Sequence, residues 1–350
     1  MPLLRSAPED FRVDEVPLYD PCGEGEHTFV RVEKRLLTTE QVAHGLARAA
    51  GVPPRDVGYA GRKDRWAVTT QWFSVPRLDP ERALGLELAG ARVLEAVRHR
   101  HKLRTGQLRA NRFRIAVRQV AVEACRVAEA RLAELCQRGM PNRFGEQRFG
   151  REGDNVERAQ RLWRGERLGV DRRAARFLLS ALQAAVFNDA LAARAGRIDR
   201  LEAGDVAVVH ASGGLFRVED LRREAPRAAA FEISATGPIF GTRVLAPGGA
   251  VAERERALLA ARGVDLENLR PPRGIQLRGA RRALRVRPEA VSFTAGGGEI
   301  RVAFSLPPGS YATVLIEELL GAAGTLGADD TGVRAGVSCP PRAQDWEDPP

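Results

Sequence analysis

In residues 112–118, RFRIAVR, large apolar side chains stand at every second position, and three of the other four positions are arginine. This pattern predicts a strand that turns Phe113, Ile115 and Val117 into a core and an arginine face toward solvent. Comparable stretches predict further strands at 28–34, 57–60, 68–75, 206–210, 215–220 and 299–306. The chain must therefore build sheets that bury one face.

Helical segments stand between these strands. Thr38 begins a Thr-Thr-Glu-Gln capping box with Gln41, and Gly51 and Pro53 end the helix that follows. Further helices are predicted at 121–138, 172–195 and 250–262, whereas 310–320 fits a strand or a helix. No clean βαβ repeat occurs, so the order predicts an α+β fold with a mixed or antiparallel sheet and helices.

The net charge is +10 with a pI near 10.3. A basic excess of this size favours a polyanionic partner, most often a nucleic acid, although an arginine-rich composition alone also raises the pI. Among the 55 cationic residues, the only lysines are Lys34, Lys63 and Lys102. A lysine is therefore informative here: Lys63 adjoins Asp64, and Lys102 lies in the densest basic run.

Several classes of protein are not expected. The sequence has no apolar run long enough for a transmembrane helix, and its N-terminus lacks a signal-peptide pattern, which predicts a cytoplasmic protein without membrane contact. The scattered cysteines form no CxxC motif, and no histidine lies at metal-ligand spacing, so we expect no disulfide and no zinc. The cysteines are Cys22, Cys125, Cys136 and Cys339.

Asp64 is the first candidate for chemistry. It lies in GRKDR, among Arg62, Lys63 and Arg65, between two predicted strands. These cations favour its ionised form, which suits nucleophilic attack better than proton donation. A solvated turn is the alternative, because aspartate is common in turns.

Two other segments could contact RNA. Residues 98–114, RHRHKLRTGQLRANRFR, are rich in cations that could bind phosphates, or they could be a solvated charge run. Residues 141–155, PNRFGEQRFGREGDN, carry Phe144 and Phe149, which could stack on bases, and Asn142, which could read a base edge. A packed loop with aromatic anchors is the alternative for the second segment.

Together these segments resemble the TruD family of tRNA pseudouridine synthases. The matching pieces follow the family order along nearly the whole chain except the tail, and GxKDxxAxTxQ joined to NxFGxQRFG is highly specific. The pieces are PEDFRVDE (8–15), GEGEHTFVRVEK (23–34), GYAGRKDRWAVTTQW (58–72), RHRHKLRTGQLRANRF (98–113), PNRFGEQRFGREGDN (141–155), FLLSALQAAVFNDALAAR (177–194), TGPIFGTR (236–243) and LPPGSYATVLIEEL (306–319).

The resemblance implies an isomerase that converts a uridine of tRNA to pseudouridine, usually at position 13 in the D arm, without cofactor or metal. It implies a catalytic domain of residues 1–155 and 286–322, split by an inserted α+β TRUD domain of residues 156–285. Residues 323–350, rich in Gly, Pro and Asp, are predicted to be a disordered tail. We expect a monomer, because a cleft between two domains needs no partner.

The resemblance also implies site residues. The family's aspartate falls on Asp64, and its substrate-contact phenylalanine falls on Phe11. The asparagine and aromatic of its PNxFG motif fall on Asn142 and Phe144. The family motif GSFAT reads GSYAT here, so Tyr311 takes the place of phenylalanine.

Cations complete the predicted site. Arg5, Lys63 and Arg62 are the candidates for holding Asp64 ionised, and the sequence does not choose among them. Lys102 and Arg104 are expected to contact tRNA phosphates.

Two rival interpretations remain at this point. A non-catalytic RNA-binding protein or RNA chaperone accounts equally well for the charge and the aromatics, but it does not explain an aspartate at the centre of a basic segment. An RNA methyltransferase is disfavoured because no glycine-rich cofactor loop follows an early strand.

Overall fold

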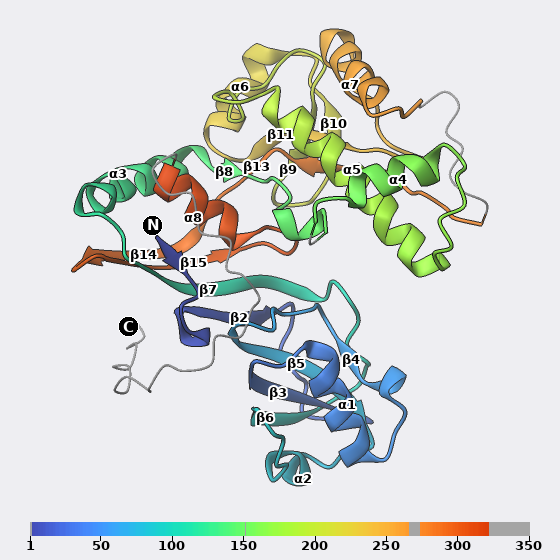
Figure 1. Ribbon diagram of the computed structural model, residues 1–350, viewed down its shortest axis with the longest axis vertical. Coiled ribbons are helices and arrows are strands. Elements are labelled where there is room, and N and C mark those ends of the chain that lie inside the picture. The colour runs from blue at the N-terminus through green and yellow to red at the C-terminus, as the bar shows by residue number, and fades with distance from the viewer. Residues whose placement is uncertain (1, 151, 266–273, 322–350) are drawn as a thin grey trace.

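The computed structural model describes residues 2–150, 152–265 and 274–321. The predicted tail at 323–350 lies outside the described residues. Within them the fold is α+β, as expected from the sequence, with a large mixed sheet, a smaller sheet and helices packed against both (Figure 1).

The large sheet has the strand order β14-β15-β7-β2-β5-β3-β6, with β1 added to β7 and β4 added to β5. Its pairs are antiparallel except for β2 and β5, which are parallel. The strands are β1 (Leu3–Leu4), β2 (Phe11–Pro17), β3 (His27–Arg35), β4 (Gly58–Tyr59), β5 (Val68–Pro76), β6 (Ala91–His99), β7 (Leu108–Arg118), β14 (Glu289–Gly296) and β15 (Glu299–Leu306). The two ends of the described chain therefore meet in one sheet.

Strand β7 confirms the alternation in the sequence. Phe113, Ile115 and Val117 are buried in a core shared with helices α3 (Val122–Arg138) and α8 (Ala312–Leu320). On the opposite face, two of the arginines are paired with carboxylates and do not simply face solvent as expected. Arg114 pairs with Asp14 at 2.7 Å, and Arg118 pairs with Asp10 at 2.7 Å. These cations stabilise the sheet and are not free for phosphate.

Helix α1 (Thr39–Ala50) begins as its capping box predicts. Thr38 Oγ1 accepts a hydrogen bond from Gln41 N, and Gln41 Oε1 accepts one from Thr38 N. Gly51 ends the helix in the left-handed region at φ 68°, which costs glycine little. The short helix α2 (Pro80–Leu84) follows β5. The ambiguous segment 310–320 contains helix α8.

The described residues between 155 and 283 supply the smaller sheet, with strand order β10-β9-β11-β12, and four helices. The helices are α4 (Asn155–Trp163), α5 (Arg172–Ala192), α6 (Leu221–Ala229) and α7 (Gly249–Ala261). The strands are β9 (Val206–Val209), β10 (Leu215–Arg217), β11 (Ile233–Ile239) and β12 (Ala280–Ala283). In Figure 1 this part lies beside the large sheet, with α5 across its middle.

The chain enters and leaves this second part at adjacent places. Strand β8 (Met140–Pro141) pairs antiparallel with β13 (Arg285–Val286). The guanidinium of buried Arg285 stabilises this pairing, because it donates hydrogen bonds to the carbonyl oxygens of Arg138 and Ala228. A domain inserted into another domain needs its entry and exit strands to lie close together, as β8 and β13 do.

Candidate active site

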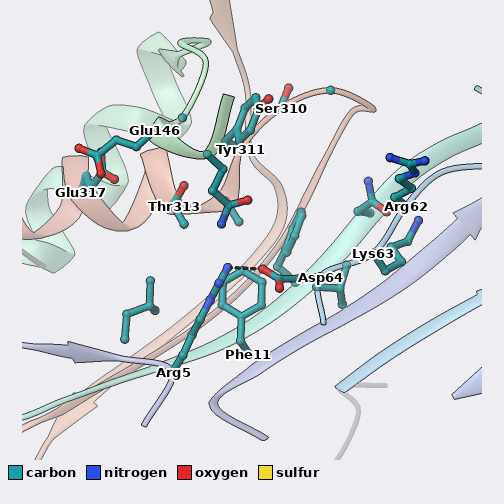
Figure 2. A pocket seen from close by; sticks show the side chains of 18 residues that line it. Arg5, Phe11, Arg62, Lys63, Asp64, Glu146, Ser310, Tyr311, Thr313 and Glu317 are labelled. Atoms are coloured by element: carbon teal, nitrogen blue, oxygen red, sulfur yellow. Dashed lines mark ion pairs between the residues drawn. The ribbon is translucent and has the colours of Figure 1, made fainter. Parts of the chain in front are cut away.

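A cavity of about 490 Å³ lies where segments far apart in the sequence meet. Arg5 follows β1, Phe11 begins β2, Asp64 lies between β4 and β5, and Tyr311 precedes α8 (Figure 2). Its size is in the range of small-molecule sites. The structure thus brings together four residues that the sequence singled out.

The Asp64 carboxylate is held at both oxygens. Arg5 lies 2.8 Å from Oδ2, as the dashed line in Figure 2 shows, and the backbone N of Trp66 donates to Oδ1 at 3.1 Å. The guanidinium of Arg5 also lies over the ring of Phe11, 4.2 Å from its centroid, which adds a cation–π contact. Of the candidate cations, Arg5 is the one that pairs with Asp64.

The other two candidates pair elsewhere. The Lys63 ammonium turns to Glu15, and both side chains are almost fully buried. Arg62 pairs with Glu40 at 2.6 Å on the surface. Lys63 still lines the cavity, but its ammonium is paired with Glu15 and not with Asp64.

Side chains from neighbouring elements fix the main chain around Asp64 by hydrogen bonds. Lys34 Nζ donates to the backbone oxygen of Asp64 at 2.6 Å, and Lys63 N donates to Thr39 Oγ1 at 2.9 Å. Gln71 Nε2 donates to Gly61 O at 3.1 Å. These bonds hold the carboxylate in one position.

Lys34 was not predicted as a site residue. It is only 1% exposed, and this burial lowers the pKa of its ammonium to about 8, although the charge of Asp64 acts in the opposite direction. The rarity of lysine in this chain was the signal that could have found it.

Tyr311 forms the opposite side of the cavity. Its ring meets the ring of Phe144 edge-on, with centroids 6.1 Å apart. A Cβ on Gly145 would lie 3.1 Å from the Tyr311 ring, which is a tight contact, so a side chain there would push against the ring. The Tyr311 hydroxyl forms no hydrogen bond within the described residues.

Asn142 and Phe144 lie behind the cavity and not on its wall. Asn142 is 6% exposed; its Nδ2 donates to Ala283 O at 3.0 Å, and its Oδ1 accepts from Ser310 Oγ at 3.2 Å and from Arg282 at 2.5 Å. Arg282 also covers the Phe144 ring at 4.3 Å. Burial lowers the pKa of Arg282 to about 10. Sequence reasoning missed this arginine, which links the two predicted residues.

Lys102 and Arg104 line a different groove, of about 730 Å³. Lys102 Nζ donates to the backbone oxygen of Arg55 at 2.6 Å. The groove also contains His27, His99 and His101, which are three of the five histidines in the chain. Burial lowers the pKa of His27 and of His99, which favours their neutral forms.

The described parts of the chain offer neither a metal site nor a membrane span. No group of at least three His, Cys, Asp or Glu residues there could hold a metal ion. Cys22, Cys125 and Cys136 are free thiols, and Cys339 lies outside the described residues. No described helix has the length and apolar character needed to cross a membrane.

Comparison with known proteins finds one family that matches almost the whole chain. The family model described as tRNA pseudouridine synthase D (TruD) matches residues 2–165 and 154–319. Proteins named tRNA pseudouridine synthase D are 48% identical in Anaeromyxobacter sp. strain Fw109-5 (92% of this chain, 93% of the relative) and 42% identical in Thermus thermophilus (91% and 88%).

A solved structure shares the fold. It is a crystal structure of a Methanosarcina mazei protein whose assignment as tRNA pseudouridine synthase D is itself provisional. The TM-score is 0.76 at 22% identity, and the match covers 91% of this chain and 93% of that one.

Proposed function

Because this chain belongs to the TruD family and is a tRNA pseudouridine synthase, we propose that Asp64 carries the isomerisation of a uridine in the D arm, at position 13. The observation that carries this assignment is the Asp64 carboxylate held between Arg5 and the Trp66 amide, on the wall of a cavity of about 490 Å³.

The chemistry needs few groups. The bond from ribose C1′ to uracil N1 breaks, the base turns, and a bond from C1′ to C5 forms. Asp64 acts either as a nucleophile, at C1′ or on the uracil ring, or as a base that removes a ribose proton. The reaction is redox-neutral and consumes no water, so these residues need no cofactor or metal.

The target uridine must leave its stack to reach Asp64, which costs a few kcal/mol. Tyr311 offers its ring to the flipped base from the wall of the cavity. Phe11 also lines the cavity, but it is 4% exposed and lies under the Arg5 guanidinium, so it acts by holding Arg5 in place. For Asn142 and Phe144 the geometry supports an indirect role, since their contacts with Ser310 and Tyr311 position the wall that faces the base.

The remaining tRNA is proposed to bind between the two parts of the molecule. Residues 1–155 and 286–322 would form the catalytic domain, and residues 156–285 an inserted TRUD domain; the pairing of β8 with β13 supports these limits. Lys102 and Arg104 would contact phosphates outside the catalytic cavity. The protein would work as a monomer in the cytoplasm.

The rival function is RNA binding without catalysis. It explains the basic groove equally well, but it gives no reason to bury Lys34 and the Lys63–Glu15 pair around one aspartate loop. Burying such charges costs free energy, and sites that fix a catalytic group commonly carry this cost.

Pseudouridine mapping tests the proposal. Unmodified tRNA transcripts would be incubated with the purified protein and no added cofactor. We expect new pseudouridine at position 13. Pseudouridine elsewhere would refute the position, and none in any tRNA would refute the catalytic assignment in favour of RNA binding.

A further inference from the structure

Along the paired strands β2 and β7, the residues on one face of the sheet change from apolar to polar at the same pair. Their paired residues run Phe11 with Ile115, then Val13 with Phe113, then Glu15 with Asn111. The first two pairs are apolar and buried, whereas the third is polar. The apolar stripe of both strands therefore ends in a polar pair, and one member of this pair, Asn111, lines the cavity.

The two polar residues of this third pair differ in their bonding. Glu15 is occupied, because it receives the Lys63 ammonium and the backbone N of Trp72 at 3.2 Å. Asn111 lines the cavity, and its amide forms no hydrogen bond with any residue that the structure describes. Its Oδ1 is buried as well as unpartnered.

A buried amide oxygen without a partner destabilises the folded protein until water or a ligand completes its hydrogen bonds. No hydrogen bond from the described residues fixes which end of the Asn111 amide faces the cavity, and a half-turn about Cβ–Cγ exchanges its oxygen and nitrogen. The amide can therefore present one acceptor and two donors to whatever enters beside Asp64.

Building on the proposed function, we propose that Asn111 binds the N3 edge of the target uracil. Its Oδ1 accepts a hydrogen bond from N3–H, and its Nδ2 donates to the neighbouring carbonyl oxygen of the base. An amide is suited to this edge because the edge itself presents a donor beside an acceptor.

The N3 edge of the uracil keeps its position while the base turns during the reaction. The C1′–N1 bond breaks and the C1′–C5 bond forms, C5 loses its proton, and N1 carries a proton in the product. A half-turn of the ring about the axis through N3 and C6 exchanges N1 with C5 and O2 with O4. N3–H stays on the axis, and a carbonyl oxygen lies beside it before and after. Asn111 can hold the base as a pivot while it turns.

The test pairs an enzyme change with a substrate change. Asn111→Leu keeps the size of the side chain and removes its hydrogen bonds, and 3-methyluridine at the target removes N3–H. We expect Asn111→Leu to lower the single-turnover rate on uridine roughly ten- to a hundredfold, with unchanged tRNA affinity. The methyl group should slow the wild type similarly and slow the variant little further.

Three results would overturn the inference: a wild-type rate for Asn111→Leu, a wild type indifferent to the methyl group, or the same methyl penalty in both enzymes. The last result would mean that Asn111 only supports the fold. Melting temperature checks folding, and Asn111→Ala replaces the leucine variant if that one is unstable. Since the wild type acting on uridine is the reference, an inactive wild type would refute the proposed function rather than the role of Asn111.

Discussion

The Asp64 loop and the groove around Lys102 are both rich in cations, but they use them differently. Around the loop, Arg5 pairs with Asp64, and Lys63 pairs with Glu15. In the groove, Lys102 bonds only a backbone oxygen, and Arg104 forms no ion pair within the described residues.

The difference separates two tasks that net charge alone does not distinguish. A cation paired inside the protein fixes geometry, and its removal should harm folding or the chemical step. A cation left to solvent can meet phosphate, and its removal should harm affinity and salt dependence. Substitutions in the two regions should therefore change different measured quantities.

The largest expected effect comes from the buried pair. Lys63→Met leaves the Glu15 carboxylate buried without its cation, which should lower the free energy of unfolding by about 3–5 kcal/mol. Urea unfolding measures this. The matched control is Glu9→Gln, which breaks the exposed Arg35–Glu9 pair and should cost ~1 kcal/mol or less. Equal costs for the two variants would contradict the distinction.

Lys34→Met should act on the chemical step. It removes the bond to the Asp64 backbone oxygen, so the carboxylate loses its fixed position and kcat should fall roughly ten- to a hundredfold. The affinity for tRNA should stay the same, because Lys34 is buried. A variant with weaker binding and an unchanged kcat would place Lys34 among the RNA contacts instead.

Charge reversal in the groove should weaken tRNA binding and leave the chemical step unchanged. Lys102→Glu with Arg104→Glu should weaken tRNA binding roughly tenfold or more and reduce the slope of log affinity against log salt by about 2. The single-turnover rate at saturating tRNA should be unchanged. Arg126→Glu, an exposed site on α3, is the control with one such charge change. A groove variant with wild-type salt dependence would remove the groove from the binding surface.

The pKa of Lys34 gives a prediction for stability. Burial lowers it from 10.5 to about 8, and Asp64, Lys63 and Glu40 are the charged groups that act on it. Between these pH values the unfolded chain binds the extra proton, so this group makes stability rise with pH. The unfolding free energy of the wild type relative to Lys34→Met should increase from pH 8 to 10.5. A flat difference would mean that Lys34 titrates normally.

The smallest effect is expected at Tyr311. Its hydroxyl forms no hydrogen bond within the described residues, while its ring packs on Phe144. Tyr311→Phe should therefore leave kcat/KM within about twofold of the wild type. A larger loss would show that the hydroxyl contacts the RNA.

The sequence predicted local structure well, and it singled out a segment that lines the cavity. Alternation predicted β7, the capping box predicted the start of α1, and the basic segment around Asp64 lies at the cavity. These features depend on near neighbours in the chain, which are visible in one sequence.

The partners of the site could not be predicted in this way. Lys63 and Glu15 are 48 residues apart, and Lys34 is 30 residues from Asp64. Sheet register and the burial of β3 bring them together. For the same reason Asn142, which looked like a group for reading bases, is instead bonded to Arg282 and Ser310 behind the cavity.

The central claim is that Asp64 performs chemistry and the groove performs binding. The most direct test is Asp64→Asn, which keeps the shape of the side chain, measured for tRNA affinity and for single-turnover pseudouridine formation. The account predicts wild-type affinity within a few-fold and no detectable product. Product formed at a rate near that of the wild type would contradict it, and so would an equal loss of binding and product.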